Sequence, residues 1–244
     1  MIPNTRLITL AALNLFAFPS AAEDAGALAA TSGYFEGWDA SGDLAGWSAS
    51  SSLSSVTQVD TGGNPGGFLW SRVSDGSTGG VSTGLPAATG DFTGTPWTVS
   101  FDLFLFSGGF SDIWLRFRYH DATFNGWRFG FAPPPTNAWT SFSVTFDPSW
   151  TDAQARAAGW TTDSPDGFRS VSFSQTLADV YSTELRFAGP GRMVAGLDNF
   201  SLEVVPEPST VGLALVGAIG VLLGMRRRSG AARATVPKAV SVRP

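Results

Sequence analysis

The sequence predicts an all-β fold, an antiparallel β-sandwich or jelly roll with one short helix, between an N-terminal signal peptide and a C-terminal transmembrane helix. Three observations lead to this prediction. The 244 residues include 29 glycines and 15 prolines, which favour short strands and turns over long helices. Apolar residues make up 43% of the chain, enough for the packed core of one or two domains. Several segments alternate apolar and polar residues, as strands with one buried face do.

The first 22 residues have the pattern of an export signal. Arg6 precedes a mainly apolar run from Leu7 to Phe18, and the small residues Ser20 and Ala22 follow at the positions that signal peptidase reads. The alternative is a buried N-terminal helix. We expect cleavage after Ala22 and a mature chain outside the cytoplasm.

Five segments between residues 97 and 204 alternate with the period of strands. The side chains expected to face inward are Trp97, Val99, Phe101, Leu103 and Leu105; Ile113, Leu115, Phe117 and Tyr119; Trp127, Phe129 and Phe131; Phe142, Val144 and Phe146; and Phe200, Leu202 and Val204. Short strands at such intervals are typical of a sandwich or jelly roll.

One helix is predicted among these strands, in the segment DPSWTDAQARAAGW. Thr151 is a suitable N-cap, Asp152 lies in the first turn, alanines follow, and Gly159 ends the helix. We expect this helix to close one end of the sandwich.

The charge of the exported part argues against a nucleic-acid partner. Residues 23–205 carry 19 acidic side chains and eight basic ones, all arginine. Nucleic-acid binding depends on lysine and arginine that neutralise phosphates. The chain has no cysteine, which excludes disulfides, thiol catalysis and cysteine metal sites.

The C-terminal region predicts a membrane anchor. Residues 210–225 are uncharged and mostly apolar, and as a helix they would span roughly 24 Å at about 1.5 Å per residue, slightly short of a typical hydrocarbon core. The cluster Arg226, Arg227 and Arg228 favours the cytoplasmic side, so the body lies on the other side, in agreement with the signal peptide. Residues 229–244 are then a cytoplasmic tail.

Hydrophobicity does not explain the tripeptide Pro206, Glu207 and Pro208 in front of the anchor. The sequence VPEPS, an apolar helix and an arginine cluster together resemble the PEP-CTERM sorting signal of Gram-negative bacteria, here residues 205–228. The resemblance implies recognition and tail removal by exosortase, in hosts that make exopolysaccharide and biofilm matrix. Two prolines hold an extended backbone that an enzyme can read. The alternative is an ordinary anchor with a proline-rich linker.

The body, residues 31–205, shows a weaker and longer resemblance. The segments GDFTG, WTVSFDLFLFSG and FSQTLADVYSTELRFAGPGRMVAGLDNFSL are similar to the laminin B (laminin IV type A) domain of extracellular matrix proteins. FEGWD and LDNFSL also resemble the first and last strands of galactose-binding-like carbohydrate-binding modules. Both resemblances imply a jelly roll with a binding or structural role at the cell surface or in the matrix.

The second resemblance implies a structural calcium site. In such modules the first and last strands adjoin, and one acidic residue from each, here Glu36 and Asp198, helps to bind Ca²⁺ with backbone carbonyls. Carboxylate and carbonyl oxygens are the ligands this ion prefers. The alternative is that Glu36 is solvated and Asp198 caps a turn.

A glycan-binding face is a further hypothesis. Trp114, Arg116, Arg118 and His120 lie on the outward side of one predicted strand. An indole stacks on a pyranose ring, and arginines hydrogen-bond hydroxyls or pair with acidic sugars. The alternative is that Trp114 packs beneath a loop or against the helix.

Catalysis is not expected from this sequence. The single histidine, His120, has Asp121 as a neighbour, which does not establish a hydrolytic triad. The ExDxxE motif of bacterial jelly-roll glucanases is absent, although a polysaccharide hydrolase with two distant carboxylates stays the alternative function. The expected function is non-enzymatic adhesion, matrix structure or glycan binding.

Overall fold

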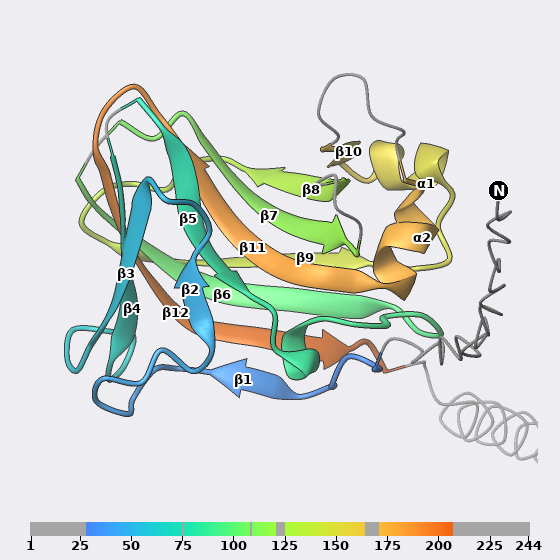
Figure 1. The fold of residues 1–244 in the computed structure, drawn as a ribbon, viewed down its shortest axis with the longest axis horizontal. Coiled ribbons are helices and arrows are strands. Elements are labelled where there is room, and N and C mark those ends of the chain that lie inside the picture. Colours follow the sequence, from blue (N-terminus) through green and yellow to red (C-terminus); the bar gives the residue numbers. More distant parts are fainter. Residues whose placement is uncertain (1–27, 75, 108, 121–124, 164–170, 207–244) are drawn as a thin grey trace, which may run out of the picture.

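The structure is a computed structural model that describes residues 28–206 except 75, 108, 121–124 and 164–170. It is a sandwich of two antiparallel six-stranded sheets, as predicted (Figure 1). The first sheet has the order β3-β4-β12-β6-β9, with β1 also paired to β12: β1 Tyr34–Glu36, β3 Ser54–Val59, β4 Phe68–Val73, β6 Trp97–Ser107, β9 Trp139–Phe146 and β12 Met193–Val204. The second sheet has the order β10-β8-β7-β11-β5-β2: β2 Trp47–Ala49, β5 Thr78–Thr83, β7 Asp112–Tyr119, β8 Gly126–Phe131, β10 Trp160–Thr162 and β11 Val180–Ala188.

The core lies between the two sheets and is rich in aromatic side chains. All five predicted inward residues of β6 are at most 4% exposed, as are Ile113, Leu115 and Phe117 of β7. Trp160 packs against Phe117, Phe146 and Phe173, with ring centroids 5.4–5.7 Å apart. Such aromatic contacts add to the stabilisation from burial, so the core holds without disulfides.

Two α-helices, not one, lie at one end of the sandwich (Figure 1). Helix α1, Asp152–Ala157, is the predicted one, and the N-cap Thr151 forms a capping box with Gln154. Helix α2, Phe173–Ala178, was not predicted, although Ser172 and Gln175 form the same box. The Phe173 amide donates to Asp152 (2.8 Å), which ties the two helices together.

The outer face of the first sheet carries an aromatic cluster over Gly196 of β12. Its members come from β4, β6 and β9: Phe68, Trp70, Phe104, Phe106 and Trp139. A Cβ atom at position 196 would lie 3.0–3.2 Å from three of these rings. Glycine therefore leaves the space into which the rings pack.

Candidate functional site

The outer face of the second sheet brings together polar side chains of β7 and β11. Antiparallel pairing sets Arg118 opposite Ser182, Arg116 opposite Glu184, and Trp114 opposite Arg186. Cross-strand neighbours on one face lie within contact distance. The residues of β7 that were predicted to face outward therefore lie directly beside polar residues of β11.

Glu184 is the centre of an ion-pair network on this face. Its carboxylate lies 3.4 Å from Arg116 and Arg118 and 3.8 Å from Arg186, and it is 2% exposed. Asp163 lies 2.6 Å from Nε of Arg116. Burial lowers the pKa of Arg116, while Glu184 and Asp163 act in the opposite direction. The network fixes the arginine side chains in place.

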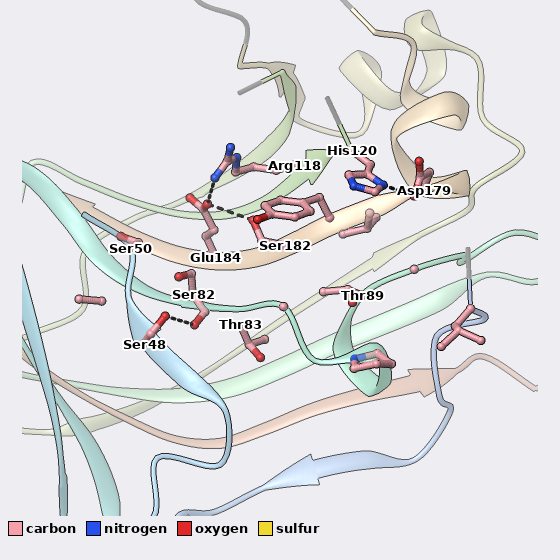
Figure 2. A pocket seen from close by; sticks show the side chains of 17 residues that line it. Ser48, Ser50, Ser82, Thr83, Thr89, Arg118, His120, Asp179, Ser182 and Glu184 are labelled. Atoms are coloured by element: carbon pink, nitrogen blue, oxygen red, sulfur yellow. Dashed lines mark hydrogen bonds and ion pairs between the residues drawn. The ribbon is translucent and has the colours of Figure 1, made fainter. Parts of the chain in front are cut away.

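A hollow of about 600 Å³ opens beside this network, and we call it the main groove (Figure 2). Its lining includes Arg118, His120, Tyr181, Ser182, Glu184, Ser48, Ser50 and Ser82. The Ser182 hydroxyl donates to Glu184 (3.1 Å), and the Ser48 hydroxyl donates to the carbonyl of Ser82. Hydroxyl, guanidinium and carboxylate groups from β2, β5, β7 and β11 thus converge on one concave surface.

Tyr181 supplies the aromatic surface of the main groove. The register between β11 and β7 shifts between Val180 and Ser182, and Tyr181 stands at this β-bulge. Its side chain is 52% exposed, stacks on the His120 ring at 5.4 Å and lies beneath the guanidinium of Arg118 at 5.5 Å. His120 in turn lies 3.6 Å from Asp179. An exposed, oriented phenol ring of this kind can stack on a sugar ring.

Trp114 lines a second, smaller hollow of about 380 Å³ on the same face. The Arg128 guanidinium lies over its indole ring at 5.1 Å. Gly130 lies opposite Trp114 on β8, and a Cβ atom there would meet nothing within 4 Å. The open position leaves the hollow accessible beside the indole.

The structure separates the three residues of the glycan-binding hypothesis. Arg118 lines the main groove and Trp114 the smaller hollow, whereas Arg116 is 4% exposed and bridges Glu184 and Asp163. A ligand in the main groove would therefore contact Arg118 directly and Arg116 only through Glu184. Their role in glycan binding stays a prediction.

Glu36 and Asp198 lie on adjoining strands, because β1 pairs with β12. Asp198 is fully buried and accepts hydrogen bonds from the amides of Asn64 (2.5 Å) and Asn199 (2.8 Å). Burial raises the pKa of Asp198 to about 6, and the charges of Asp102 and Asp39 act in the same direction. Glu36 accepts a hydrogen bond from the amide of Trp38.

Among the described residues, Glu36 and Asp198 are not part of a larger group of side chains that could coordinate calcium. Within the described part of the chain, no group of three or more carboxylate or histidine side chains is placed to hold a metal ion. Calcium at Glu36 and Asp198 therefore stays a prediction.

Several predicted features lie outside the described residues. They are the signal peptide with Ala22, the motif residues Glu207 and Pro208, the anchor 210–225, the cluster Arg226–Arg228 and the tail 229–244. Within the described ranges, no helix is long and apolar enough to cross a membrane.

Sequence reasoning missed Tyr181, Glu184 and Asp163. The bulge that orients Tyr181 and the register that sets Glu184 between three arginines depend on strand pairing. The available signal in the segment YSTELR was its glutamate, a charged residue between residues typical of strands.

Comparison with known proteins identifies the C-terminal signal and the fold. The PEP-CTERM protein-sorting motif matches residues 204–228, and no curated protein matches the chain.

Among solved structures, part of an exo-β-agarase aligns with a TM-score of 0.50 and 13% identity, over 74% of this chain and 26% of that one. The family 11 carbohydrate-binding module of Lic26A-Cel5E from Clostridium thermocellum (15% identity, TM-score 0.49) aligns over 74% and 99%. The CBM22-1 xylan-binding domain of Xyn10C from Paenibacillus barcinonensis (13% identity, TM-score 0.48) aligns over 73% and 99%. At these identities the similarity concerns the fold alone. The chain consists of a jelly-roll β-sandwich followed in the sequence by a PEP-CTERM sorting motif.

Proposed function

We propose that this protein is a non-enzymatic glycan-binding protein, exported, sorted by exosortase and delivered to the cell surface or biofilm matrix. The single observation that carries glycan binding is the main groove, where the half-exposed aromatic ring of Tyr181 lies beside Arg118 and several hydroxyl groups. Sugar sites combine such an aromatic surface with a few oriented polar groups.

The groove supports binding better than hydrolysis. Glu184 pairs with three arginines and is buried, so its carboxylate is held in ion pairs and is not positioned to protonate a glycosidic oxygen. The hydroxyl proton of Ser182 goes to Glu184, whereas a nucleophilic serine would donate to His120. A polysaccharide hydrolase remains the competing function, and release of reducing sugar from a polysaccharide panel would support it.

Glycan-array binding by the purified body tests the proposal. Tyr181→Ala and Arg118→Met are expected to lower binding at least about tenfold, since each removes one principal contact. Phe35→Ala is the matched control, because Phe35 is an exposed aromatic (59%) on the other sheet. Binding that survives both groove variants would refute the site, and Trp114→Ala then tests the smaller hollow.

Sorting is tested in the native host. Mass spectrometry of membrane, cell-surface and medium fractions is expected to find the chain without residues 1–22 and, at the surface, without the segment after Pro208. An intact C-terminus found only in membranes would make the protein a permanently anchored periplasmic one. A laminin B-like role in matrix structure would then lose its support.

A further inference from the structure

The sorting motif begins inside the folded domain. The matched motif starts at residue 204, and Val204 is still paired with Trp97 as the last residue of β12. The next amide, that of Val205, donates to the carbonyl of Pro96 (2.8 Å). Pro206, the first residue of the Pro-Glu-Pro tripeptide, follows directly, so no spacer separates the motif from the sandwich.

The end of β12 is held from two sides. The Val204 amide donates to the Ser32 hydroxyl (3.1 Å), and the carbonyl of Leu202 accepts from the Gly33 amide (2.9 Å). Leu202 itself is fully buried. Pulling this strand end away to free the motif would break these bonds and expose Leu202.

A preformed hollow of about 470 Å³ surrounds the point where the chain leaves the sandwich. It is lined by Val205, Pro206, residues 93, 94 and 96, and residues 147–149. The first wall is fixed by Trp97, whose indole donates to the carbonyl of Phe92 (2.8 Å). The second wall is a turn in which Asp147 accepts from the Ser149 amide (2.8 Å). We call the rim formed by residues 93–96 and 147–149 the exit face.

An enzyme that reads Pro206 to Pro208 must therefore work directly against the exit face. Glu207 is the second residue after the bonded Val205 in the sequence, and at about 3.3 Å per residue a fully extended tripeptide can span at most ~10 Å. Among the described residues that line the hollow, only Asp147 carries a charged side chain. An uncharged, apolar side chain is the partner chemistry that this hollow fits.

We propose that the exit face is a docking surface for the membrane sorting enzyme, which inserts an apolar side chain beside Pro96 and Pro148 while it binds the tripeptide. This inference rests on the sorting part of the proposed function and is independent of glycan binding. The enzyme then selects a folded domain end together with a linear motif.

The first test is a spacer of six Gly-Ser residues inserted between Val205 and Pro206 in the full chain, expressed in the native host. Pulse-chase labelling with mass spectrometry of the product measures the rate of tail removal. We expect the rate to fall about tenfold, as for the loss of one well-packed contact. An equal or faster rate would overturn the docking surface, because it would show that the enzyme reads the motif alone.

The second test changes the rim without moving the motif. Thr93→Lys and Ser149→Lys place long charged side chains at exposed positions of the exit face, and Thr57→Lys is the matched control on β3. We expect slower tail removal for the first two variants only, with the Tm of all three unchanged. Equal rates in all three would also overturn the surface. A wild-type chain that is never processed would refute sorting itself.

Discussion

Replacing Glu184 by glutamine tests whether the buried network holds the second sheet together. Glutamine keeps the shape of the side chain but removes the charge that faces Arg116, Arg118 and Arg186. Removing one partner of a buried ion pair costs about 3–5 kcal/mol, because uncompensated charge stays buried. A typical domain has a free energy of unfolding of only about 5–15 kcal/mol. The loss is therefore a large part of the total stability.

The expected shift is measurable by thermal and denaturant unfolding. For a domain of this size, each kcal/mol lowers Tm by about 2–4 °C, so Glu184→Gln is expected to lower it by about 6–20 °C. Glu203→Gln is the matched control, since Glu203 is exposed on β12 and should change stability by less than about 0.5 kcal/mol. Both variants keep the same fold in far-UV circular dichroism.

A second substitution tests whether the loss of the Glu184 charge beside the arginines is the cause of the lower stability. In the Glu184→Gln background, Arg186→Met removes one of the three cations that lose the charge of Glu184, so the double variant should be more stable than the single one. A free energy of unfolding for Glu184→Gln within 1 kcal/mol of the Glu203→Gln control would refute the reasoning. It would show that the arginines are solvated rather than held by the carboxylate.

Three further measurements address other parts of the molecule. Burial raises the pKa of Asp198 to about 6, so its ionised form destabilises the folded state, and the free energy of unfolding should fall by about 2 kcal/mol as pH rises from 4 to 7. Asp198→Asn should lack this part of the pH dependence. If urea titrations give the variant the same dependence of the free energy of unfolding on pH as the wild type, Asp198 is not its cause. Gly196→Ala should cost about 1–3 kcal/mol because its Cβ meets aromatic rings at 3.0–3.2 Å, whereas Gly130→Ala, with nothing within 4 Å, should cost less; equal denaturation midpoints would refute the packing argument. Calcium at Glu36 and Asp198 predicts a higher Tm in excess calcium than in chelator, and identical melting curves would remove that hypothesis.

The sequence predicted the core strands well where burial alone determines the pattern. In β6, every second residue from Trp97 to Leu105 faces the other sheet, so apolar alternation was a sufficient signal. The helix after Thr151 was equally readable, because its capping box is local in sequence. Both features depend on residues within one short segment.

The candidate site could be predicted only in part, because it depends on pairing between distant segments. Arg116 was placed on the outward face, but its burial follows from Glu184, which lies 68 residues away in the sequence. The position of Tyr181 depends on an irregularity in the register, which alternation cannot reveal. Predicting the exit face from the sequence would likewise require knowing that the end of β12 lies against the loop that precedes β6.

The second sheet ends on both sides in very short strands, β2 and β10, of three residues each. Long unpaired edges act as templates on which other chains add strands and aggregate. If the protein is displayed in many copies on the cell surface, as we propose, each copy meets others at high local concentration. The short edge strands of the sheet that carries the main groove disfavour edge-to-edge pairing of neighbouring copies, which would leave the proposed binding groove accessible.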